Sequence, residues 1–144
     1  MNPIVFSGKS RFLSKHQRTS LRKLLHTTAE NKGYSILQLT YVFVDDETLY
    51  KINVEHLQHN TYTDIITFDL GDGESAEIDG EIYITVDRVK ENAIMLQQKE
   101  EMEMVRVISH GLLHLLGVKD KSPADAKQMR QEEDACLSLW LSFK

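Results

Sequence analysis

The spacing of apolar residues along the chain predicts a succession of strands and helices. Alternating positions rich in β-branched and aromatic residues indicate strands at 4–6, 35–44, 63–70 and 80–86. Apolar residues at intervals of three and four indicate helices at 14–31, from 45 or 46 to 57, at 87–98, around 103–116, and from 123 onward. The clearest turn is Gly-Asp-Gly-Glu at 71–74.

The order of these elements, β-α-β-α-β-β-α-α-α, bounds the fold class. It predicts an α+β protein with mixed α/β layers, in which a sheet of about four strands is covered by four or five helices. No repeat, low-complexity segment or linker divides the chain. Residues 1–144 are therefore expected to form a single domain.

The last predicted helix has an apolar side and a polar side. Met129, Cys136, Leu139 and Trp140 recur at helical spacing, and the Gln-Glu-Glu-Asp run at 131–134 is expected to face water. Because Cys136 is the single cysteine, it forms no internal disulfide. Its place among apolar residues favours a buried structural thiol over a reactive one.

The helix around 103–116 contains the residues most suited to metal chemistry. His110 and His114 are four residues apart, so both imidazoles lie on one helix face. Gly117 can end the helix in the left-handed conformation, and Asp120 follows three residues later. Two histidines and one aspartate suit a single Zn²⁺ ion that keeps a fourth position for water. The alternative is an ordinary C-cap glycine and a solvated loop carboxylate, but the combined spacing favours the metal site on this helix and turn.

Composition and charge indicate a cytoplasmic protein with an uneven charge distribution. No apolar run approaches the roughly 20 residues that span a bilayer, and the start of the chain does not resemble a signal peptide. The net charge is −5, yet the first 29 residues contain no acid and six bases: Lys9, Arg11, Lys15, Arg18, Arg22 and Lys23. This basic stretch either docks phosphates or merely forms a solvated helix face, and both interpretations remain open.

The metal motif is similar to the signature of the YbeY family of endoribonucleases, which are bacterial rRNA maturation factors. The match extends from about residue 40 to residue 121, and the motif at 110–117 is its most specific part. Further positions resemble the family pattern: Asn53, the run Thr-Asp-Ile-Ile-Thr-Phe at 63–68, Gly-Glu-Ile-Tyr-Ile at 80–84, Glu103 and Arg106.

The resemblance implies a zinc-dependent endoribonuclease that cuts single-stranded RNA. It would act in maturation of the 3′ end of the small-subunit rRNA and in ribosome quality control. Its implied partners are rRNA, the small ribosomal subunit, and a ribosomal or GTPase protein, with no membrane association.

Two positions depart from the family pattern. Asp120 stands where the family usually has a third histidine, and aspartate is also a competent zinc ligand. Leu57 stands where the family has an arginine thought to serve the reaction. A leucine cannot hold a phosphate, so His59, His56 or the basic N-terminal stretch would have to replace it.

The catalytic residues are less defined than the metal ligands. The candidates are His59, just before the third strand, and Asp64, at the start of that strand. Asp64 is either a partner that orients a metal-bound imidazole or a turn-capping carboxylate.

Two other functions share parts of this pattern. A metzincin peptidase has the same ligand spacing but needs a glutamate after the first histidine, and Gly111 occupies that position. A metal-stabilised ribosome assembly factor without catalytic activity would tolerate Leu57 in place of the arginine.

Overall fold

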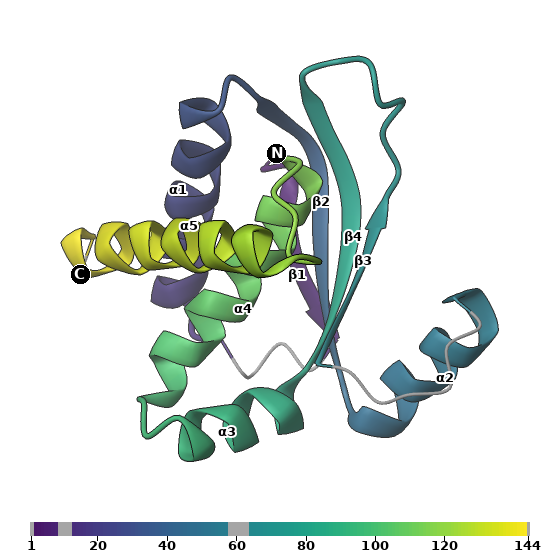
Figure 1. Ribbon diagram of the computed structural model, residues 1–144, viewed down its shortest axis with the longest axis vertical. Coiled ribbons are helices and arrows are strands. Elements are labelled where there is room, and N and C mark those ends of the chain that lie inside the picture. Colours follow the sequence, from purple (N-terminus) through teal and green to yellow (C-terminus); the bar gives the residue numbers. More distant parts are fainter. Residues whose placement is uncertain (1, 9–12, 58–63, 144) are drawn as a thin grey trace.

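The computed structural model describes residues 2–8, 13–57 and 64–143 of the chain. Its centre is a four-stranded mixed sheet with the order β1-β2-β4-β3 (Figure 1). The three strands β1, β2 and β4 are parallel, and β3 pairs antiparallel with β4 at one edge. The strands are β1 (Ile4–Gly8), β2 (Ser35–Val44), β3 (Ile65–Asp69) and β4 (Glu77–Thr85).

Helices pack mainly on one side of this sheet. Figure 1 shows α1, α4 and α5 together on that side, while α2 projects from the other side near the end where α3 lies. The α+β class and the four-stranded sheet predicted from the sequence are therefore confirmed. The helices are α1 (Lys15–Asn31), α2 (Asp46–Leu57), α3 (Val86–Met95), α4 (Glu100–Leu115) and α5 (Pro123–Ser142).

Capping residues explain where several helices begin. Ser14 and Gln17 form a reciprocal capping box at the start of α1, as their spacing permits. Asp45 accepts a hydrogen bond from the backbone N–H of Thr48 and so caps α2. Ser122 accepts from the N–H of Asp125 at the start of α5, where Pro123 fills the first turn.

Several predicted boundaries were wrong by one to three residues. The strand predicted from residue 80 begins at Glu77, because the long strand β2 extends its pairing to the register Ser35↔Glu77. The helix predicted at 87–98 begins at Val86, because Thr85 ends the strand and caps the helix through the N–H of Arg88. That helix ends at Met95, and Gln97 turns the chain with a φ of 54°.

Most of the buried apolar residues form one cluster between the sheet and the helices. Helix α4 lies within this layer, and Val105, Ile108 and Leu112 are almost fully buried. The hydroxyl of Tyr41 on β2 donates to the carbonyl of Ile108 at 2.8 Å and ties α4 to the sheet. Cys136 is buried, as predicted, and burial raises the pKa of its thiol. Within the described ranges, no helix has the length and apolar character required to cross a bilayer.

Candidate metal centre

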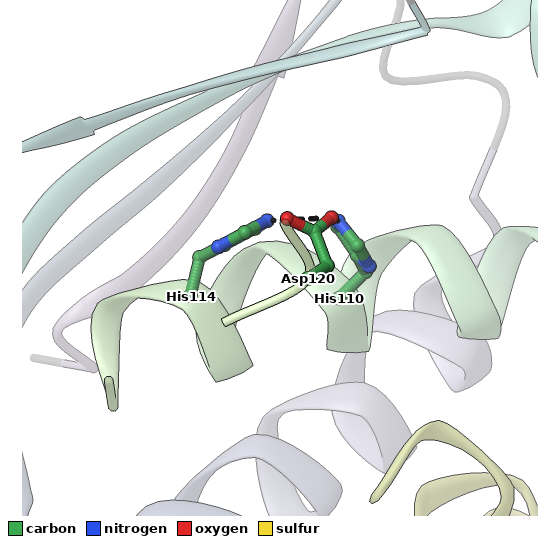
Figure 2. A group of neighbouring side chains, drawn as sticks. All are labelled: His110, His114 and Asp120. Carbon is green, nitrogen blue, oxygen red and sulfur yellow. Dashed lines mark ion pairs between the residues drawn. The ribbon is translucent and has the colours of Figure 1, made fainter. Parts of the chain in front are cut away.

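Helix α4 presents His110 and His114 on the same face. Their ring centroids are 4.5 Å apart and the rings are nearly perpendicular, at 83°. Figure 2 shows both side chains rising from the same side of the helix toward Asp120. Both histidines are partly buried, as expected for side chains at the rim of a packed helix. The four-residue spacing predicted that both imidazoles lie on one helix face, and the structure confirms this.

The turn after α4 returns the chain to these histidines. Gly117 has a φ of 91°, which a residue with a side chain adopts only at a cost. Its N–H donates to the carbonyl of His114, and the N–H of Val118 donates to the carbonyl of Leu113, both at 3.0 Å. These two bonds are those of a Schellman motif. The turn brings Asp120 over the helix that precedes it.

The three side chains converge closely enough to hold one metal ion. Oδ2 of Asp120 lies 3.5 Å from Nε2 of His110 and 3.4 Å from Nε2 of His114. Two zinc bonds of about 2.0–2.1 Å at a tetrahedral angle would separate their ligand atoms by about 3.3–3.4 Å. Among the described residues, His110, His114 and Asp120 form the one group of three potential metal ligands, and their ligand atoms all lie within 4.8 Å of one another. The donor set and its spacing fit a zinc ion with one open position.

A buried glutamate from α5 contacts the first of these histidines. Oε2 of Glu133 lies 2.6 Å from Nδ1 of His110, and Oε1 accepts a hydrogen bond from Nη1 of Arg106 at 3.0 Å. Glu133 is only 6% exposed, so the prediction that it faces water was wrong.

The sequence did contain a signal for this burial. Glu133 continues the helical spacing of Met129, Cys136 and Trp140, all of which are buried. It is therefore an acid within the apolar stripe of α5, and such a residue requires a polar partner.

The electrostatics of the site favour positive charge at His110. Burial alone would lower the pKa of His110, but the hydrogen bond and charge of Glu133, with the charges of Asp120 and Asp64, raise it. Burial and the neighbouring His110 lower the pKa of His114. Burial would raise the pKa of Glu133, but its bonds to His110 and Arg106 lower it, so its carboxylate stays charged.

Asp64 lies beside this group. A pocket of about 270 Å³ is lined by Asp64, Glu103, Arg106, His110, Asp120 and Glu133, together with Ile65 and Val107. Asp64 accepts a hydrogen bond from Nδ2 of Asn92 at 3.3 Å. The hydrogen bond of the His110 imidazole is accepted by Glu133, the residue that the sequence interpretation overlooked.

The other sequence candidates are His59, Leu57 and the basic N-terminal stretch. His59 lies outside the described residues, and so do Lys9 and Arg11 of the basic stretch. Leu57 is the last residue of α2. Arg22 and Lys23 make intramolecular contacts, since Nε of Arg22 donates to the carbonyl of Ile4 and Nζ of Lys23 lies 4.6 Å from the ring centroid of Phe143.

Gly111 faces the sheet at a close approach. A Cβ atom at this position would lie 2.8 Å from Cδ1 of Ile82 and 3.2 Å from Cδ1 of Ile65. The helix can contact the sheet here because the residue has no side chain. The position that holds the catalytic glutamate of a metzincin peptidase therefore has no room for one in this fold.

Comparison with known proteins agrees with the geometry of the site. The family model described as endoribonuclease YbeY matches residues 6–140. The endoribonuclease YbeY of Cytophaga hutchinsonii is 47% identical over 123 residues, covering 85% of each chain. That of Flavobacterium johnsoniae is 48% identical over 120 residues, covering 83% of this chain and 82% of its own.

A solved structure shares the fold at lower identity. The solution structure of a Thermotoga maritima protein superimposes with a TM-score of 0.66 and 22% identity, covering 96% of this chain and 89% of that one. The family match over nearly the whole sequence confirms the resemblance first noted at residues 110–117. The chain belongs to the endoribonuclease YbeY family.

Proposed function

We propose that this protein is a zinc-dependent endoribonuclease that cuts single-stranded RNA during maturation of the 3′ end of the small-subunit rRNA. The observation that carries the proposal is the convergence of His110, His114 and Asp120, with Oδ2 of Asp120 at 3.4–3.5 Å from both imidazoles, in a chain of the endoribonuclease YbeY family. Zinc is the proposed metal because two imidazoles and one carboxylate, with a fourth position left for water, form a donor set used in catalytic zinc sites.

The residues at the site would have two roles, metal binding and proton transfer. His110, His114 and Asp120 would hold the ion beside the pocket that Asp64 and Glu103 line. A zinc ion in such a site lowers the pKa of water and polarises a phosphoryl oxygen. Asp64 is the candidate to accept a proton, because it lines this pocket and is not one of the three ligands. His59 remains a second candidate.

The charge of the protein supports RNA binding that depends on a partner. A net charge of −5 opposes indiscriminate association with phosphates. We infer that the small ribosomal subunit, through its rRNA and a ribosomal or GTPase protein, presents the RNA to the site in the cytoplasm.

The peptidase alternative lacks the glutamate that serves as general base in its motif, so Glu103 or Asp64 would have to replace it. In the described part of the chain, Gly111 stands at the position of that base and packs against Ile82 and Ile65. The assembly-factor alternative differs from the proposal only in that the protein would not cut RNA, so a cleavage assay distinguishes the two functions.

The test uses small ribosomal subunits that carry unprocessed rRNA. Wild type, His114→Ala and the control His26→Ala are incubated with them, with and without a zinc chelator, and bound metal is assayed in parallel. Cleavage near the 3′ end by wild type and the control, lost in His114→Ala and under chelation, is the expected result. Bound zinc without cleavage would favour the assembly factor, and absence of bound metal in wild type would contradict the metal site.

A further inference from the structure

Glu133 belongs to a different helix from the histidine that it contacts. His110 is on α4 and Glu133 is on α5, 23 residues later in the sequence. Helix α5 packs across α4 in the helical layer (Figure 1). The two side chains therefore meet through tertiary packing, unlike His110, His114 and Asp120, which one helix and its turn bring together.

The contact determines which nitrogen of His110 carries a proton. An ionised carboxylate only accepts hydrogen bonds, and a neutral imidazole has one N–H. At 2.6 Å from Oε2 of Glu133, Nδ1 of His110 must be the protonated nitrogen. In the neutral ring, which is the form that binds a metal, Nε2 lies 3.5 Å from Asp120 and is left with its lone pair facing the ligand group.

The carboxylate of Glu133 is itself held in a fixed orientation. One oxygen bonds to His110 and the other accepts from Arg106 at 3.0 Å, so both oxygens are used. The guanidinium of Arg106 also lies 3.7 Å from Glu103 and 3.6 Å from Asp134. A buried carboxylate fixed at both oxygens cannot rotate away from the imidazole without also losing its own hydrogen bond to Arg106.

We propose that Glu133 is a positioning residue that fixes the tautomer and ring orientation of His110 and thereby strengthens metal binding. A metal-bound histidine usually donates its other N–H to a carboxylate or carbonyl, which orients the ring and raises its basicity. Arg106 supports this role by holding Glu133. The inference rests on the proposed function only for the identity of the metal, and it requires no RNA cleavage.

The chain offers a matched control at the neighbouring position. Glu132 is also on α5, but its carboxylate forms an ion pair with Lys32, which follows α1. It does not line the pocket of about 270 Å³ beside His110. Glu132→Gln and Glu133→Gln therefore make the same change in charge and volume on adjacent residues, of which one contacts the metal group.

The first measurement is zinc affinity, by competition with a chromophoric chelator. Glu133→Gln is expected to bind zinc about 10–100-fold more weakly than wild type, whereas Glu132→Gln binds like wild type. Far-UV circular dichroism and thermal melting of the zinc-free proteins establish that both variants fold. Equal zinc affinity in Glu133→Gln and Glu132→Gln would overturn the proposal.

The second measurement needs no metal. Long-range proton–nitrogen NMR spectra of the zinc-free protein, at a pH where the rings are neutral, should place the His110 proton on Nδ1 in wild type. The proton should move in part to Nε2 in Glu133→Gln and stay on Nδ1 in Glu132→Gln. A wild-type proton on Nε2 would overturn the role of Glu133. If wild type binds no zinc, the proposed function fails, while these spectra still decide the role of Glu133.

Discussion

Helix α4 has two faces that the structure constrains in different ways. On the packed face, Gly111 contacts the sheet so closely that even a Cβ atom would clash, and the carbonyl of Ile108 accepts a bond from Tyr41. On the polar face, Arg106, His110 and His114 are spaced at four residues and make specific polar contacts. The packed face limits the size of a side chain, whereas the polar face limits its chemistry. Changes on the first should therefore alter stability, and changes on the second should alter metal binding.

The largest expected effect comes from Gly111→Glu, which would create the His-Glu-x-x-His pattern of a peptidase. We expect a loss of more than about 4 kcal/mol in the free energy of unfolding, because the side chain meets Ile82 and Ile65 and buries a charge. Denaturant unfolding measures this, and a peptidase assay should show no activity.

Gly111→Ala is the graded control for this change. It adds a single carbon at the same contact, and its loss is expected to be about 1–3 kcal/mol. A stable Gly111→Glu variant with peptidase activity would contradict the close packing of α4 against the sheet.

Removing zinc tests the polar face without changing the chain. At a free zinc concentration of 100 times Kd, binding adds about 2.7 kcal/mol to the free energy of unfolding, so chelation should lower Tm by roughly 5–10 °C. Differential scanning calorimetry with and without chelator measures the shift, and circular dichroism should show that the helices remain. The combined change His110→Ala with His114→Ala should make Tm independent of zinc; a shift that persists would place the metal elsewhere.

The two histidines should differ in what their loss does to the zinc-free protein. His110→Ala and His114→Ala should each abolish tight zinc binding. Only His110→Ala removes the partner of Oε2 of buried Glu133, at a cost of about 1–3 kcal/mol in the free energy of unfolding. Urea unfolding of the zinc-free variants measures the difference. Equal stability of the two variants would mean that Glu133 does not depend on His110.

The metal ligands and the residue that supports them differ in how well the sequence predicts their positions. His110, His114, Gly117 and Asp120 lie within eleven consecutive residues, so helical spacing and one glycine turn were sufficient to bring them together. Glu133 could not be placed in the same way, because its contact depends on how α5 packs across α4.

The order of the strands was not predictable for the same reason. Strand β4 lies between β2 and β3, and this arrangement depends on pairings between segments far apart in sequence. The spacing of Glu133 with Met129 and Cys136 indicated its burial, but a tertiary structure was needed to identify its partner. Local patterns thus predicted the elements and the ligands, while non-local packing determined what supports them.

The smallest expected effect tests whether the two faces are independent. Tyr41→Phe removes the hydrogen bond to Ile108 on the packed face, at a cost of about 0.5–1.5 kcal/mol in the free energy of unfolding. Zinc affinity should not change, since Tyr41 contacts none of the three ligands. A weaker affinity would mean that the position of α4 on the sheet also sets the geometry of the histidines.

The difference in stability between wild type and Tyr41→Phe should depend on pH. Burial, with a smaller contribution from the charge of Cys136, raises the pKa of Tyr41 well above its ordinary value of about 10. Above that pH the unfolded chain releases the tyrosine proton while the folded chain retains it, so ionisation favours unfolding and stability falls. Phenylalanine has no such proton. The stability advantage of wild type over Tyr41→Phe should therefore shrink as pH rises above about 10. Urea unfolding of both proteins at neutral and alkaline pH measures this, and a constant difference would show that Tyr41 is not buried in the folded protein.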